Sequence, residues 1–112
     1  MQWLIIARDG SDEDALERRL AARPAHLEHA ARLQAAGHLL IGGALINDDG
    51  EMTGTAAVAQ FETRAELDEW LTTDPYVTGD VWREIKVHPF RVAPHYDVPP
   101  CPRSERAAGD PS

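Results

Sequence analysis

The sequence HLLIGGALINDDG, residues 38–50, decides the fold. Its first part, His38–Ile46, is apolar and typical of a strand, and Asn47–Gly50 is a dense turn signal. Thr55–Glu62 (TAAVAQFE) follows shortly afterwards and alternates small and apolar residues. We therefore predict a β-hairpin in the middle of the chain, and the elements on either side of it determine the topology.

One strand and two helices are predicted before the hairpin. Gln2–Arg8 (QWLIIAR) has the bulky apolar residues of a strand, and Ala15–Leu20 predicts a short helix. Proline disfavours the α conformation of the residue before it, here Arg23, and suits the first turn of a helix. We therefore expect the first helix to end near Arg23 and a second, longer helix to run from Pro24 to Gly37.

Another helix and strand are predicted after the hairpin. Thr63 is expected to cap a helix over Arg64–Leu71, and Trp82–Val92 reads as the last strand, which Pro89 places at an edge or a bulge. The order strand, helix, hairpin, helix, strand predicts a ferredoxin-like βαββαβ fold of the α+β class. Such a fold has a four-stranded antiparallel sheet with its helices on one face.

The other face of the sheet predicts a homodimer. The first two strands are apolar on both sides, although a face in contact with water should be polar. A second copy packed face to face would cover it, as in dimeric α/β-barrel proteins. Residues 1–93 are expected to form this domain, and the Pro-rich residues 94–112, which contain the single cysteine Cys101, a flexible tail.

Composition and charge argue against several classes of partner. The formal net charge of -8 at pH 7 repels phosphates, so nucleic acids and anionic membranes are not expected partners. The longest apolar runs are too short to span a bilayer, and no signal-peptide pattern precedes Arg8, so we expect a cytoplasmic protein.

His26 is the residue most suited to chemistry. Helical periodicity turns it inward with Ala30 and Leu33, whereas His29 is rotated toward solvent, so the two histidines do not form a metal site and no metal is expected. His26 also lies near the start of the expected second helix, where the helix dipole favours a neutral imidazole that can accept a proton. A hydrogen-bonded histidine of the core would show the same pattern.

Two segments resemble the signatures of the YciI-like (YCII-related) family: Arg23-Pro24-Ala25-His26-Leu27 and Asp74-Pro75-Tyr76. The similarity extends from Met1 to about Val92. It includes Gly42-Gly43, which favour a bulge in the second strand or the close approach of a ligand. The resemblance implies a ferredoxin-like dimer with a His–Asp pair in a cleft.

Carried over to this chain, the resemblance implies His26 and Asp74 as the catalytic pair. Arg23 and Tyr76 flank them and are expected to orient an anionic or phenolic small molecule. Each also has a structural interpretation: Asp74 as a turn residue, Arg23 as a cap or an ion-pair partner, and Tyr76 as a packing residue.

Three functions are compatible with these residues and this fold. The first is an enzyme without a cofactor, a lyase or isomerase acting on a small cyclic or aromatic oxygenated compound. One branch of the family removes chloride from a chlorinated hydroxyhydroquinone, which requires a base and no metal or organic cofactor. The second is a non-catalytic, dimeric accessory protein that binds a small molecule in the same cleft. The third is a cofactor-free oxygenase of the dimeric α/β-barrel type, which rests on fold alone.

Overall fold

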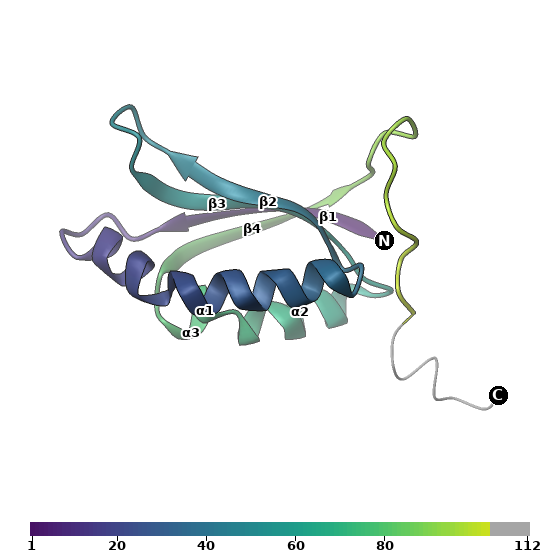
Figure 1. Ribbon diagram of the computed structural model, residues 1–112, viewed down its shortest axis with the longest axis horizontal. Helices are drawn as coiled ribbons and strands as arrows, with labels where there is room; N and C mark the ends of the chain where they lie inside the picture. Colours follow the sequence, from purple (N-terminus) through teal and green to yellow (C-terminus); the bar gives the residue numbers. More distant parts are fainter. Residues whose placement is uncertain (104–112) are drawn as a thin grey trace.

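The computed structural model describes residues 1–103. Its elements are β1 (Gln2–Asp9), α1 (Ala15–Ala35), β2 (Leu39–Ile46), β3 (Met52–Gln60), α2 (Arg64–Thr73), α3 (Pro75–Thr78) and β4 (Trp82–Phe90). The four strands form one antiparallel sheet in the order β2-β3-β1-β4. Figure 1 shows the helices together beneath one face of this sheet. The predicted ferredoxin-like α+β fold is confirmed, with β4 at an edge as Pro89 indicates.

The core lies between β1 and the helices. Trp3, Ile5 and Ala7 alternate along β1 and are almost fully buried, because a central strand has neighbours on both edges and helices over this face. α2 buries Leu67, Trp70 and Leu71 against them, so these three residues share one side of the helix as predicted. This packing fixes the position of the segment that follows α2.

A capped helix start holds α2 in place. The Thr63 side chain accepts a hydrogen bond from the backbone N–H of Glu66 at 3.2 Å, so the predicted cap is confirmed. Asp74 follows the last residue of α2 and is in turn the N-cap of the short helix α3.

The predicted break at Pro24 is wrong. α1 is a single helix that continues through Pro24, and Figure 1 shows its N-terminal part inclined to the rest, as expected of a helix with an internal proline. Proline cannot donate the hydrogen bond to the carbonyl of Leu20, at a typical cost of about 3 kcal/mol. Leu20 and Pro24 are both exposed, so water can satisfy that carbonyl while the opposite side of the helix packs on the protein.

The described part of the C-terminal segment contacts the domain. Gln60 donates from Nε2 to the carbonyl of Pro99 at 2.8 Å, and the amino group of Met1 lies 4.0 Å from Sγ of Cys101. The segment up to residue 103 therefore lies against one end of the sheet (Figure 1). The predicted division at residue 93 stays a prediction, and the rest of the expected tail, 104–112, lies outside the described residues.

Candidate active site

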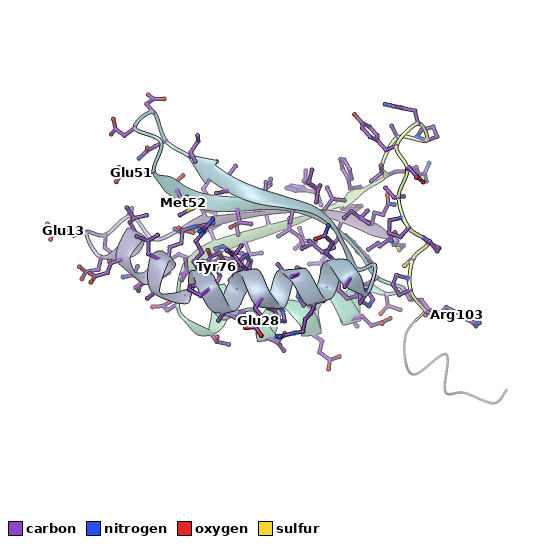
Figure 2. All side chains as sticks on the ribbon, viewed as in Figure 1. Glu13, Glu28, Glu51, Met52, Tyr76 and Arg103 are labelled. Carbon is purple, nitrogen blue, oxygen red and sulfur yellow. The ribbon has the colours of Figure 1, made fainter. Side chains whose placement is uncertain are left out.

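One face of α1 carries three basic residues that line the same cleft, of which Arg19 is buried, His26 is half-buried and Arg23 is exposed. Arg19, Arg23 and His26 follow one another at spacings of four and three residues, which places them on one side of a continuous helix. Figure 2 shows Tyr76 between α1 and the sheet, whereas Glu28 projects from the other side of the helix. The candidate site lies between this basic face, α3 and the sheet.

His26 and Asp74 form the centre of the site. Nδ1 of His26 lies 2.8 Å from Oδ1 of Asp74, and the Asp74 side chain is almost completely buried. The same Oδ1 accepts the backbone N–H of Tyr76 at 2.9 Å, so Asp74 caps α3 and holds the imidazole at once. Asp74 is therefore a turn residue, as its structural interpretation predicts, and it also lies next to His26, as the resemblance implies.

The carboxylate sets the tautomer of a neutral His26. A proton on Nδ1 is donated to Asp74, which leaves Nε2 as the acceptor. Nε2 makes no hydrogen bond to any of residues 1–103, and 13% of the side chain is exposed. The sequence-based reason for a neutral imidazole was wrong, however, because His26 lies in the middle of α1, far from the positive end of the helix dipole.

Tyr76 is stacked against this pair. Its ring lies 3.7 Å from the His26 ring between centroids, at an interplanar angle of 13°, and the residue is 1% exposed. Burial raises the pKa of Tyr76 above its usual value, while the positive charges of Arg19 and Arg23 oppose this rise. Tyr76 therefore does pack in the core, and it also fixes the plane of the imidazole.

A buried polar network adjoins the stack. Nη1 of Arg19 lies 3.0 Å from Oδ1 of Asp9, both side chains are 3% exposed, and the guanidinium carbon lies 4.6 Å from the centre of the Tyr76 ring. Oγ1 of Thr55 accepts hydrogen bonds from Nη2 of Arg19 at 2.9 Å and Nε1 of Trp82 at 3.2 Å. The network joins β1, α1, β3 and β4 behind the His–Asp pair.

This network was not predicted from the sequence. The predicted end of a helix before Pro24 placed Arg19 and His26 on different helices. The spacing of Arg19, Arg23 and His26 was the available signal, because it aligns the three residues on a continuous helix.

A cleft of about 470 Å³ connects these residues with the edge of the sheet. His26 and Arg23 border it on the α1 side, and Gly42, Ala57 and Ile5 border it on the sheet side. The cleft exists because α1, α2 and α3 cover the centre of the sheet but leave much of β2 exposed. Its volume is within the usual range for small-molecule sites, about 300–1,000 Å³.

The model of the YCII-related domain matches residues 1–91. This chain belongs to the YCII-related family. Protein YciI of Escherichia coli O6:H1 is 37% identical over 97 residues, which covers 81% of this chain and 97% of that protein. An uncharacterized protein of Haemophilus influenzae is 36% identical with the same coverage.

A solved structure confirms the fold of this YCII-related chain. It is the 5-chloro-2-hydroxyhydroquinone dehydrochlorinase TftG from Burkholderia phenoliruptrix, in complex with 2,5-dihydroxybenzoquinone. The TM-score is 0.72 at 24% sequence identity, and the match covers 87% of this chain and 100% of TftG. At that identity the similarity concerns the fold alone.

Two further predicted features can be placed in the YCII-related domain. Arg23 borders the cleft and makes no ion pair or hydrogen bond within residues 1–103, so neither a cap nor a pair with a nearby glutamate is present there. His29 is not turned to solvent as expected, because its Nε2 accepts a hydrogen bond from Nε1 of Trp70 at 2.9 Å. Arg23 is thus the free positive charge at the cleft among the described residues.

The described part of the YCII-related chain has neither a cluster of metal ligands nor a membrane-spanning helix. No three His, Cys, Asp or Glu side chains of residues 1–103 gather closely enough to hold a metal ion. No helix in the same range has the length and apolar character needed to cross a bilayer.

Proposed function

We propose that this chain is an enzyme of the lyase or isomerase type that transfers a proton on a small cyclic or aromatic oxygenated compound. The observation that carries the proposal is the 2.8 Å contact between Nδ1 of His26 and the buried carboxylate of Asp74, at the wall of an open cleft. A base is the group that proton abstraction requires, so the reaction needs no cofactor for this step.

His26 would act as the general base and then as the general acid. Its Nε2 accepts the proton of the substrate, and Asp74 stabilises the imidazolium that forms. Positioned bases of this kind contribute roughly 10²–10⁴ to a rate. Arg23 would bind an oxygen anion of the substrate at the mouth of the cleft, and Tyr76 would keep the imidazole in its plane.

The dehydrochlorinase activity of TftG suggests one concrete reaction. In such an elimination the base removes a proton from the ring compound, and chloride leaves with the electron pair of the C–Cl bond. The overall change is the loss of HCl, so no oxidant or reductant is needed. The proposal for this chain is the same class of reaction on a related compound, with His26 as the base.

Chloride release from 5-chloro-2-hydroxyhydroquinone tests the proposal. We expect His26→Ala to lower the rate by about 100-fold or more and Asp74→Asn by at least about tenfold. His95→Ala removes an exposed histidine outside the cleft and should leave the rate unchanged. Thermal unfolding of each variant checks that the fold is retained.

Two outcomes would contradict the proposal. Full activity of His26→Ala would exclude His26 as the base. Binding of 2,5-dihydroxybenzoquinone without turnover of the chlorinated compound, weakened by Asp74→Asn, would instead support the non-catalytic binding protein.

We further propose that two copies associate through the face of the sheet opposite the helices. Ile41 is 68% exposed and pairs across the strands with Val58, which pairs with Leu4, so these apolar residues share that face. Sedimentation should give a dimer for the wild-type protein and a smaller species for Ile41→Asp. A monomer at every concentration would contradict this arrangement.

A further inference from the structure

Gly42 has no structural reason to be glycine. Its backbone φ is not positive, unlike those of Gly37 and Gly50, and the register shifts of β2 lie at either end of the strand and not at Gly42. The irregularity expected in the second strand therefore lies between Leu39 and Ile41, next to the two glycines but not at them. A Cβ added to Gly42 would lie 3.7 Å from Cβ of Ala57, an ordinary van der Waals contact.

Gly54 shows what a structural requirement looks like in the same sheet. A Cβ at Gly54 would collide with the carbonyl oxygen of Ala7. Gly42 meets no such obstacle, and glycine inside a strand weakens it because it has no side chain to pack. Glycine at position 42 therefore slightly lowers the stability of the strand, and no close packing contact requires it.

The position of Gly42 suggests a role for the space that the absent side chain leaves. Gly42 pairs with Ala57, and Ala57 pairs with Ile5, which is buried beneath the helices, so the side-chain position of Gly42 is on the cleft face of the sheet. Gly42 borders the same cleft as His26. Any larger side chain there would occupy space in the cleft without disturbing the backbone.

We propose that Gly42 determines the size of the substrate, by keeping room in the cleft for a substituent on a ring compound. This inference rests on the proposed function of the cleft and specifies its substrate class. The cleft of about 470 Å³ is within the range of sites for drug-sized ligands, so a single six-membered ring does not fill it. The ring presents its oxygens to His26 and Arg23, and its apolar substituent lies over Gly42 and Ala57.

The neighbouring residue provides a matched control. Gly43 has an ordinary φ, and a Cβ added to it would meet nothing within 4 Å. It pairs with Ala56, which pairs with Ile6, so its side-chain position is on the opposite face of the sheet even though its backbone borders the cleft. Gly42→Val and Gly43→Val thus make the same change in the same strand on opposite faces.

The experiment measures by calorimetry the affinity of the full chain for 2,5-dihydroxybenzoquinone and for its 3-propyl derivative. The wild-type protein should bind the propyl compound at least as tightly as the parent. Gly42→Val should weaken the binding of the propyl compound by at least about tenfold and that of the parent by less than about threefold, because one methylene in a hydrophobic pocket changes discrimination by about 10–200-fold. Gly43→Val should leave the ratio of the two affinities unchanged.

The folded state of the variants is checked first. Valine is favoured over glycine in strands, so neither variant should unfold at a lower temperature than the wild type. Sedimentation of Gly43→Val checks that the change on the open face leaves the assembly as it was.

Three results would overturn the inference: a ratio of affinities that Gly42→Val does not change, an equal change in Gly43→Val, or no binding of the propyl compound to the wild type. The proposed function fails in a different measurement, when His26→Ala retains turnover. The two failures can therefore be distinguished.

Discussion

β1 and β2 are similar in sequence but differ in their surroundings. Both are apolar on each side, QWLIIARD in β1 and LLIGGALI in β2, yet Ile5 of β1 is 1% exposed and Ile41 of β2 is 68% exposed. β1 lies in the centre of the sheet and its Ile5 faces the helices, whereas β2 is an edge strand with one neighbour and its Ile41 lies on the opposite face. Apolar content therefore identifies a strand but does not reveal whether it builds the core or a binding surface.

The two strands also differ in what they contribute: β1 contributes mainly to stability, and β2 contributes mainly to surfaces that can bind a ligand or another chain. β1 supplies the core and, through Asp9, the partner of the buried Arg19. β2 supplies one wall of the cleft on one face and exposed apolar residues on the other. Changes in β1 should therefore act on unfolding, and changes in β2 should act on binding or association.

The largest effect is expected at the end of β1. Asp9→Ala leaves the Arg19 guanidinium buried without its carboxylate and should lower the free energy of unfolding by about 3–5 kcal/mol. Asp12→Ala removes the exposed ion pair with Arg18 and should change the urea midpoint little. Equal effects of the two substitutions in urea unfolding would contradict the distinction between buried and exposed pairs.

The two strands can be compared through the same substitution. Ile5→Ala removes a fully buried side chain and should cost about 2–5 kcal/mol of unfolding free energy. Ile46→Ala, at the hairpin end of β2 where the side chain is 64% exposed, should remain within about 0.5 kcal/mol of the wild type. A large loss for Ile46→Ala in thermal or urea unfolding would show that β2 contributes to the core.

The smallest effect concerns Tyr76 at alkaline pH. Burial raises the pKa of Tyr76 above the usual 10.0, so the unfolded chain loses this phenol proton at a lower pH than the folded protein does. Stability from this group is complete below pH 10 and falls as the pH rises toward the higher pKa of the folded state. Unfolding temperatures measured from about pH 9 to about pH 11 should show this decline.

Two phenylalanine substitutions isolate the contribution of Tyr76. Tyr76→Phe should reduce the alkaline decline, whereas Tyr96→Phe should not, because Tyr96 is 62% exposed. An unchanged decline in Tyr76→Phe would mean that other groups cause it.

Much of the architecture could be predicted from local sequence patterns. β2 was expected to start one residue before its observed first residue, Leu39, and the Thr63 cap lies where predicted, because apolar runs, turn residues and capping side chains act over a few positions. The break predicted at Pro24 was wrong, because the packing of α1 on the sheet and on α3 overrides the local preference of proline. The error concealed Arg19, which belongs to the same helix face as His26.

The sequence by itself determined the α+β class, the order of the elements and the inward orientation of His26, because these depend on periodicity and on interactions between near neighbours. Only the tertiary structure decided that Asp74 meets His26, that Arg19 is buried against Asp9, and that β2 leaves one wall of a cleft uncovered. Contacts between residues far apart in the chain depend on how all elements pack together, and a local sequence pattern does not specify which distant residues meet.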